Sequence, residues 1–341
     1  MLDDLQKIHE RDPQDALGIA EKQWQQLEED FELAVEPHDF KNVVLAGMGG
    51  SALSALVAKS WPGLQVPFEI CRAYDIPSYV GADTLFIASS YSGNTEETVS
   101  ALQQAQQTGA TIAVIASGGK LEEMAAEGGY PFLKLPGGFQ PRHVVFASLK
   151  ALLALFDGYG LTNGKASELA EYSNKVQEYI ARWTATVPTS QNVAKQIALE
   201  CMGKSVVVYA GTKLAPAAYK WKISFNENAK HIAWWDEFSE FNHNEFMGWT
   251  EQPEQKPYTV IDLRSSLEHP QIQKRFKISS RLLSGKRPEP IVVDAEGADL
   301  LEQLLSTIVL GDFVTLYTAI LSNVNPTPVA LIEKLKQELV A

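Results

Sequence analysis

Cysteine and histidine are scarce in this chain, and they lie scattered. Cys71 and Cys201 are the only cysteines in 341 residues, too few and too far apart for a disulfide framework or a zinc site, which suits a reducing cytoplasm. The six histidines show no metal-ligand spacing either. The sequence therefore predicts a cytoplasmic protein that needs neither a metal ion nor another cofactor.

Positive charge is scarce as well. Lys and Arg number 29 against 42 Asp and Glu, which gives a net charge of −13. A field of this sign repels nucleic acid and anionic membranes, so neither is an expected partner, and an anionic substrate must be captured by local groups. The N-terminus lacks an apolar signal core. The longest apolar stretch that we identify, 144–156, contains Lys150 and is shorter than the roughly 20 residues of a membrane helix.

The chain is longer than one compact core usually is, so two domains are expected. Short apolar strands alternate with helical segments in both halves, which predicts an α/β fold of two α/β/α sandwich domains, each with a central parallel sheet. We expect an N-terminal domain over 1–157, a helical connector over 158–190 and a C-terminal domain over 191–341. Residues 1–35 are predicted as amphipathic helix, and the stretch 231–242 as loop. The predicted strands are 43–46, 68–72, 85–89, 111–116, 132–135, 205–210, 258–263 and 290–293.

A hydroxyl-rich turn follows the third of these strands. Ser90, Ser92 and Thr95 lie within six residues, and a helical pattern begins directly after them. Gly93 permits a tight backbone path, and a helix that starts here directs free N–H groups and the positive end of its dipole to the same place. The turn therefore predicts an anion site, best suited to a phosphate monoester. The alternative is that Ser92 or Thr95 only caps the helix.

A second glycine-rich turn follows the first predicted strand. It has the sequence Gly-Met-Gly-Gly-Ser over residues 47–51, in which Gly50 and Ser51 are the candidates for ligand contact. It is not a P-loop, because no Gly-Lys-Ser/Thr follows, and its glycines lack the dinucleotide-binding spacing. In an open parallel sheet both turns lie beyond the carboxyl ends of strands, where ligands bind. Two such turns in one domain predict one ligand held from two sides.

Together the two turns resemble the SIS (sugar isomerase) domain family, whose members bind phosphorylated sugars at these turns. The resemblance implies two SIS-type domains and a small sugar phosphate as the substrate. The substrate-binding residues that it implies in these turns are Gly50, Ser51, Ser90, Ser92 and Thr95.

Another group of polar residues lies in the C-terminal half. Glu227 stands between two asparagines at the end of a predicted helix, and His243 follows sixteen residues later within Glu-Phe-Asn-His-Asn-Glu. The segment between them is rich in tryptophan and phenylalanine, which is typical of a partly desolvated pocket. Core packing is nevertheless the first role that we expect for these aromatic side chains. A carboxylate in such a pocket suits a general base near neutral pH. By themselves, Glu227 would more often be a solvated charge and His243 a packed histidine.

These two segments narrow the resemblance to the bifunctional phosphoglucose/phosphomannose isomerase branch of the SIS family, and the match extends over essentially the whole chain. The branch implies that Glu227 moves a proton between carbon 1 and carbon 2 of the sugar through a cis-enediol intermediate. It implies that His243 helps to open the sugar ring and that Arg142 stabilises the enediolate. It also implies a homodimer that contributes residues across its interface.

The resemblance gives roles to the end of the chain as well. Lys334 resembles the lysine that acts with the histidine in ring opening, with Lys336 as its rival and a solvated helix lysine as the alternative. Thr327 precedes Pro328 and is a candidate helix N-cap. It also stands seven residues before Lys334, where single-function phosphoglucose isomerases carry a glutamine. A threonine there implies more room near carbon 2 and hence the use of mannose 6-phosphate.

The sequence thus predicts an aldose–ketose isomerase that acts on glucose 6-phosphate, fructose 6-phosphate and mannose 6-phosphate. A non-catalytic sugar-phosphate-binding protein would not need Glu227, His243 and Arg142 together. An aminating isomerase would require an N-terminal catalytic cysteine, whereas Cys71 is the first cysteine. A metal-dependent mannose phosphate isomerase would require clustered histidines.

Overall fold

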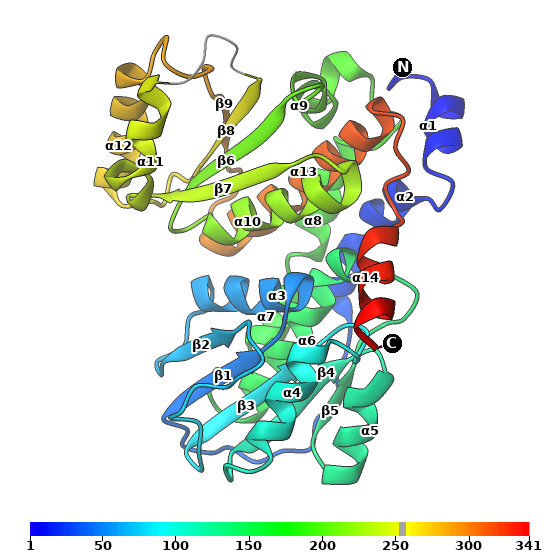
Figure 1. Ribbon diagram of the computed structural model, residues 1–341, viewed down its shortest axis with the longest axis vertical. Coiled ribbons are helices and arrows are strands. Elements are labelled where there is room, and N and C mark those ends of the chain that lie inside the picture. Colours follow the sequence, from blue (N-terminus) through cyan, green and yellow to red (C-terminus); the bar gives the residue numbers. More distant parts are fainter. Residues whose placement is uncertain (252–256, 341) are drawn as a thin grey trace. The chain divides into compact units, whose positions relative to one another are not determined.

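The computed structural model describes residues 1–251 and 257–340, which form two compact units (Figure 1). The first unit is Lys22–Lys175, and the second unit combines Met1–Glu21 with Val176–Ala341. These units do not coincide with the predicted boundaries of 1–157, 158–190 and 191–341. The first 21 residues pack with the C-terminal part of the chain, and the expected connector is divided between the two units.

The first unit contains a five-stranded parallel sheet of order β2-β1-β3-β4-β5. All the strands predicted for this half are present, and their bounds are β1 Asn42–Ala46, β2 Phe68–Cys71, β3 Thr84–Ser89, β4 Thr111–Ala116 and β5 Phe132–Lys134. The helices of this unit are the 3₁₀ helix η1 Gln23–Glu28, α3 Gly49–Ser60, α4 Glu96–Ala105, α5 Gly119–Gly128, the 3₁₀ helix η2 Pro141–His143, α6 Val145–Gly158 and α7 Lys165–Ala170. Another helix, α8 Ser173–Ala181, spans the boundary to the second unit.

The order of the strands places the two predicted anion turns next to each other. Side chains alternate between the faces of the sheet, and Val44, Phe86 and Val114 pack with Leu102 of α4 and Leu121 of α5 on one face. After β1 the chain passes through α3 to β2 at one edge, whereas after β3 it passes through α4 to β4 in the other direction. The turns that follow β1 and β3 therefore flank the point where the strand order reverses, and open α/β sheets bind ligands at this point.

The second unit contains a four-stranded parallel sheet of order β7-β6-β8-β9. Its strands are β6 Ser205–Gly211, β7 Ala233–Phe238, β8 Tyr258–Arg264 and β9 Ile291–Asp294. The α-helices of this unit are α1 Leu5–Arg11, α2 Ala16–Glu21, α9 Val193–Glu200, α10 Ala215–Ser224, α11 Glu245–Gly248, α12 Pro270–Leu282, α13 Leu300–Leu321 and α14 Ala330–Val340. Its shorter turns are the 3₁₀ helices η3 Thr189–Gln191, η5 Glu240–His243 and η6 Trp249–Glu251 and the π-helical turn η4 Phe225–Ala229.

Two predictions of local structure are wrong. Part of the predicted loop 231–242 is the strand β7. This strand lies at the edge of the sheet, where its side chains are only partly covered, and Trp234, for example, is 49% exposed. The strand therefore lacks the continuous apolar run that is typical of a strand buried on both faces. Residues 1–35 form two short helices and one 3₁₀ helix in place of a single helix. The Asp12 carboxylate causes the break, because it accepts hydrogen bonds from the N–H groups of Ala16 and Leu17 at 2.9 and 2.8 Å and so starts a new helix.

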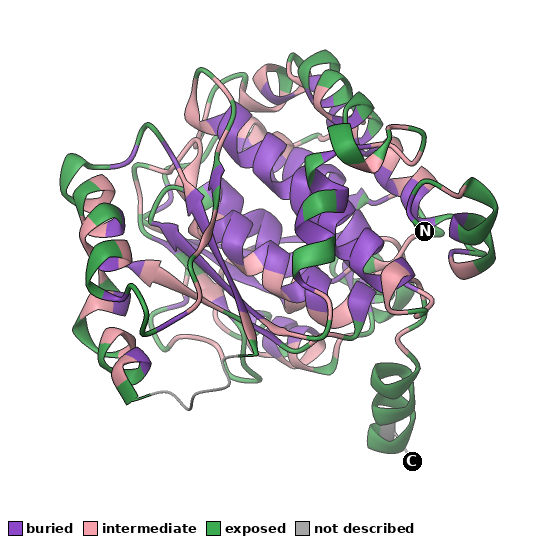
Figure 2. Cartoon of the chain, turned by 90° about the horizontal axis from the view of Figure 1, so that it is seen from above, coloured by how far each residue is buried: buried purple, intermediate pink, exposed green. Residues whose placement is uncertain are grey.

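Helix α13 forms the core of the second unit. With 22 residues it is long and apolar enough to cross a membrane, and it exceeds 144–156, the longest apolar stretch identified from the sequence. However, 94% of its most apolar window is buried, as are the central helices in Figure 2. It contacts α9 and α10. A helix that is buried to this extent is typical of the core of a globular protein.

Candidate functional site

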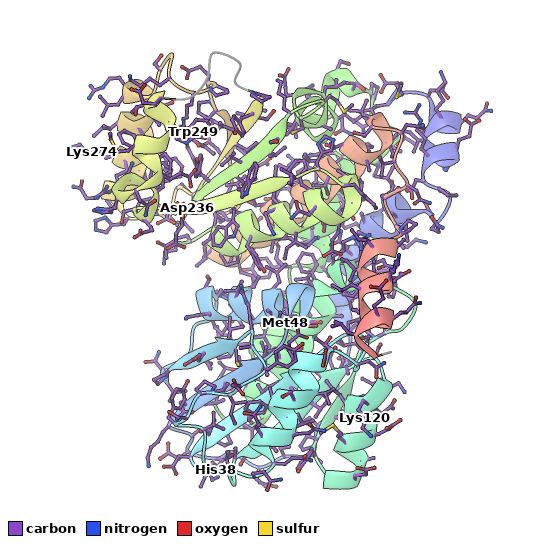
Figure 3. All side chains as sticks on the ribbon, viewed as in Figure 1. His38, Met48, Lys120, Asp236, Trp249 and Lys274 are labelled. Carbon is purple, nitrogen blue, oxygen red and sulfur yellow. The ribbon has the colours of Figure 1, made fainter. Side chains whose placement is uncertain are left out.

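The two predicted anion turns meet in the first unit. The hydroxyl oxygen of Ser51 accepts a hydrogen bond from the backbone N–H of Tyr91 at 3.2 Å. A β-carbon added to Gly47 would lie 2.7 Å from the carbonyl oxygen of Ser89, so the backbones of the two turns are in close contact. Met48, which lies in the middle of the first turn, is labelled in Figure 3 and shows where this turn lies. The two turns are therefore in contact within one unit, and it stays a prediction that both face one ligand.

The hydroxyls of the second turn do not serve as helix caps. The hydroxyl oxygens of Ser90 and Thr95 lie 2.7 Å apart. Thr95 stands at the N-cap of α4 but makes no side-chain cap hydrogen bond, and Ser92 accepts from the N–H of Asn94 at 3.3 Å, outside the helix. The capping alternative is thus wrong for both residues. The first N–H groups of a helix have no partner inside it, so the start of α4 adds donors to the hydroxyl-rich turn.

The path of the second turn depends on close backbone contact and on a tyrosine. Gly93 has φ 69°, and a β-carbon there would lie 1.7 Å from the carbonyl oxygen of Gly118, so a side chain does not fit. Tyr91 donates its hydroxyl to the carbonyl of Pro136 at 3.0 Å and accepts from the N–H of Phe139 at 2.9 Å. Burial raises the pKa of this hydroxyl. The sequence analysis did not assign Tyr91 a role, although its place inside the motif was an available signal.

Arg142 lies beside the first turn. It is in the 3₁₀ helix directly before α6, it is only 1% exposed, and its guanidinium donates to the side-chain oxygen of Gln140 at 3.4 Å. A β-carbon on Gly50 would lie 2.8 Å from the carbonyl oxygen of Pro141, so Gly50 lets the first turn pack on the backbone next to Arg142. One region of the first unit therefore holds Gly50, Ser51, Ser90, Ser92, Thr95 and Arg142.

Glu227 lies in the second unit, in the π-helical turn that continues α10. Turns of this kind are rare and frequently occur at functional sites. Both neighbours of Glu227 are anchored. The side-chain oxygen of Asn226 accepts from the N–H of Ala233 at 3.0 Å, and the side-chain amide of Asn228 donates to the hydroxyl of Thr315 at 3.0 Å. Glu227 itself is half-buried, in a turn that contacts α13.

His243 is at the other end of the same strand. It closes the 3₁₀ helix that follows β7 and is exposed, whereas Glu227 precedes β7. Because β7 has six residues, roughly 20 Å of strand separates the two ends. The structure therefore does not bring Glu227 and His243 together within one chain. They lie beyond opposite ends of β7, a separation that follows from the path of the strand and has no signal in the local sequence.

A buried hydrogen-bonded group supports the segment that carries His243. Glu245 accepts a hydrogen bond from the hydroxyl of Tyr209, which itself accepts from the indole N–H of Trp249 at 2.9 Å. Burial raises the pKa of Glu245, and the neighbouring carboxyl of Asp236 adds to this rise. Trp249 and Asp236 are both labelled in Figure 3. Trp249 serves core packing in this segment.

Both candidate lysines lie on α14. Figure 2 shows this helix as exposed along its described length. The Lys334 ammonium is 3.7 Å from the carboxylate of Glu338, and both side chains are largely exposed, as is Lys336. An exposed pair of this type adds little stability. The choice between Lys334 and Lys336 therefore stays open.

Thr327 does not cap α14, so this part of the prediction is wrong. The helix begins at Ala330, and the carbonyl of Val329 accepts its first hydrogen bonds, which makes Val329 the N-cap. The chain before it is held in a non-helical path, because the N–H of Thr327 donates to the side-chain oxygen of Asn325 at 3.0 Å. Thr327 and Lys334 consequently do not share one face of a helix.

The described residues offer no cluster of ligands for a metal ion. In residues 1–251 and 257–340, no group of three or more His, Cys, Asp or Glu side chains has an arrangement that could hold a metal ion. His143 is buried in the first unit and His243 is exposed in the second. The role of Arg142 in stabilising a developing negative charge is implied by the resemblance and stays a prediction.

Two protein-family models match the chain, one in each unit. The SIS domain model matches residues 38–127. The model described as the bacterial phospho-glucose isomerase C-terminal SIS domain matches residues 190–339.

Relatives match along most of the chain. The chain is 36% identical to the bifunctional phosphoglucose/phosphomannose isomerase of Caldicellulosiruptor bescii, with 89% of this chain and 91% of the relative covered. It is 34% identical to the enzyme of the same name from Thermoplasma acidophilum, over 88% and 90%. The D-glucosamine-6-phosphate 4-epimerase of Sulfolobus acidocaldarius is 35% identical over 60% of this chain and 63% of its own. A glucose-6-phosphate isomerase like protein from Thermus thermophilus shares the fold, with a TM-score of 0.66 over 98% of both chains at 17% identity.

Proposed function

Because the chain belongs to the family of bifunctional phosphoglucose/phosphomannose isomerases, it is a sugar-phosphate isomerase, and we propose that it interconverts glucose 6-phosphate and mannose 6-phosphate with fructose 6-phosphate. The contact between the two turns carries the proposal. The hydroxyls of Ser51, Ser90 and Thr95 lie beside the start of α4, and this arrangement suits the phosphate that all three sugars share. Both cysteines are free and buried, which supports a cytoplasmic location.

In the proposed reaction, Glu227 acts as the general base. It removes the proton from carbon 2 of the open-chain aldose, and the electron pair of that bond forms a carbon 1–carbon 2 double bond. The π pair of the carbon 1 carbonyl moves onto its oxygen, which takes up a proton to complete a cis-enediol. Return of the proton to carbon 1, with loss of the proton from the carbon 2 hydroxyl, gives the ketose. Arg142 stabilises the negative charge that develops on the enediol oxygens. His243 and Lys334, or Lys336 in its place, open the ring by moving a proton between the ring oxygen and the carbon 1 hydroxyl.

The proposed active form is a homodimer in which His243 acts with Glu227 of the partner. The separation of the two residues at opposite ends of β7 supports this arrangement. A symmetric dimer interface places the same surface of both subunits in contact, so two residues that lie apart in one chain can meet across the two-fold axis.

A complementation experiment tests the dimer. We expect the Glu227→Gln and His243→Ala variants to be nearly inactive when expressed alone and to regain activity when coexpressed. In a mixed dimer one site carries both defects and the other carries none, so purified mixed dimers should reach about half of wild-type activity. The measurement is the isomerase rate of the coexpressed proteins, purified through two different tags. No recovery in a sample shown by mass spectrometry to contain mixed dimers would contradict the shared site.

An assay on defined sugar phosphates tests the function itself. We expect both glucose 6-phosphate and mannose 6-phosphate to give fructose 6-phosphate at unchanged rates after exhaustive EDTA treatment, because Arg142 supplies the positive charge that a metal would otherwise supply. Free glucose is the control, and it should be a very poor substrate. Binding of the sugar phosphates without turnover would favour a regulatory protein. Conversion of D-glucosamine 6-phosphate in place of both aldoses would favour an epimerase, and activity restored only by added zinc would exclude the metal-independent mechanism.

The use of mannose 6-phosphate should depend on Thr327. We expect Thr327→Gln to lower the kcat/KM for mannose 6-phosphate more than that for glucose 6-phosphate. A glutamine fills the space in which the enediol turns about its carbon 2–carbon 3 bond before it takes the proton on the opposite face, and one misplaced group of this size costs of the order of tenfold. Thr327→Ser is the matched control, because it keeps the space open. Equal losses for both sugars would show that Thr327 has a structural role only.

A further inference from the structure

The residue that ends the turn of Glu227 has an unusual backbone. Lys230 follows the π-helical turn with φ 53° and ψ 27°, in the left-handed region. Glycine or asparagine is the usual residue at this place after a helix, because a larger side chain destabilises the left-handed conformation. A lysine here therefore points to a role for its side chain.

The side chain of Lys230 joins two parts of the second unit that are far apart in sequence. Its ammonium donates to the carbonyl oxygens of Glu227 at 2.8 Å and Asn228 at 3.3 Å. It also donates to the carbonyl oxygens of Asn325 at 2.9 Å and Pro326 at 3.1 Å. The first two carbonyls are at the C-terminal end of a helix, where a positive charge is favourable. The other two belong to the segment that leads into α14.

This segment ends at the residue proposed to control the choice of aldose. Pro326 immediately precedes Thr327, and the N–H of Thr327 donates to the side-chain oxygen of Asn325 at 3.0 Å. The side-chain amide of Asn325 donates in turn to Gln14 at 2.8 Å. Lys230 thus connects the backbone of Glu227 directly to the two residues before Thr327.

We propose that Lys230 is a positioning residue that fixes Thr327 relative to Glu227 and thereby sets the ratio of mannose 6-phosphate to glucose 6-phosphate turnover. The proposal rests on the proposed function of the site. The two sugars differ in the face on which carbon 2 is protonated, so their ratio depends on where the base lies relative to the groups around that carbon. Displacements of about 1 Å are sufficient to change such rates.

A glycine at position 230 tests the connection without an activity measurement. Lys230→Gly removes the ammonium but suits the left-handed backbone, so the variant should fold. We expect the amides of Asn325, Thr327 and Val329 to exchange hydrogen for deuterium at least threefold faster in this variant, with the exchange in β8 unchanged. Asn323→Gly is the matched control, because Asn323 also has a positive φ, of 55°, and loses no ammonium contact. Unchanged exchange in Lys230→Gly would overturn the connection, whatever the enzyme turns over.

A double-mutant cycle tests the effect on selectivity. We expect the loss of mannose 6-phosphate selectivity caused by Thr327→Gln to become at least threefold smaller in the Lys230→Gly background, because Thr327 is then no longer held near Glu227. Lys230→Arg should retain most of the wild-type aldose ratio, since a guanidinium still donates to carbonyl oxygens. Full additivity of the two substitutions, together with an unchanged aldose ratio in Lys230→Gly, would overturn the selectivity role even if the exchange rates rise.

Discussion

Replacement of Glu227 by glutamine should abolish isomerisation and leave the binding of sugar phosphate nearly intact. The amide has the shape of the carboxylate but cannot accept a proton from carbon 2, and the loss of a general base lowers kcat by roughly a hundredfold or more. The hydroxyls proposed to bind the phosphate lie in the other unit, so the affinity for glucose 6-phosphate should change little. Steady-state kinetics and a calorimetric titration with glucose 6-phosphate measure the two effects separately.

The matched control for this substitution is Glu200→Gln in the same unit. Glu200 is an exposed carboxylate on α9, with its nearest ion-pair contact to Lys204 at 3.8 Å, and it has no proposed part in the reaction. The same chemical change there should leave kcat unaltered. A Glu227→Gln enzyme that keeps activity within a few-fold of wild type would rule out Glu227 as the base.

The second large effect is expected at Arg142. We expect Arg142→Gln to lower kcat by about a hundredfold to a thousandfold for both aldoses, because a fixed cation near the enediolate acts mainly in the transition state. Arg142→Lys keeps the charge and should recover part of the rate. Kinetics of both variants with both sugars provide the measurement.

The burial of Arg142 calls for a test of folding alongside the kinetics. Its side chain is only 1% exposed, so the glutamine variant loses packing as well as charge. Circular dichroism and thermal unfolding identify any variant that is not folded. A folded Arg142→Gln protein with kcat within tenfold of wild type would remove Arg142 from the mechanism, and a lysine variant no better than glutamine would argue against a role for the charge.

The fold of the first unit could be predicted because its strands are short apolar runs. Residues 85–89, for example, are buried on both faces, and a helix covers each side. The edge strand β7 could not be recognised in this way, since the half-exposed carboxylates of Asp236 and Glu237 interrupt the apolar pattern. The failure is confined to β7, because the other edge strands, β2, β5 and β9, were predicted from the sequence.

The features of the candidate site also differ in whether the sequence alone could predict them. The turns proposed to bind phosphate are contiguous motifs, so the sequence alone could propose their hydroxyls. The π-helical turn around Glu227 contacts Thr315, and Lys230, with its left-handed backbone, contacts Asn325. Both partners are far away in the chain, so these two features depend on tertiary contacts. The position of His243 depends on the register of β7 in the sheet. Properties that arise from tertiary contacts have no local pattern from which to predict them.

The division of the chain between its units has a consequence for how the protein is made. Residues 22–175 form a complete unit, so this part can fold as soon as it has left the ribosome. The second unit has no such independence. Arg11 donates to the carbonyl of Ile320 at 2.6 Å, and the ammonium of Lys195 donates to the carbonyl of Leu2 at 2.7 Å. Residues 1–21 therefore cannot complete their packing before α13 has been synthesised, and the apolar surface of α2 that packs on α13 stays uncovered until then.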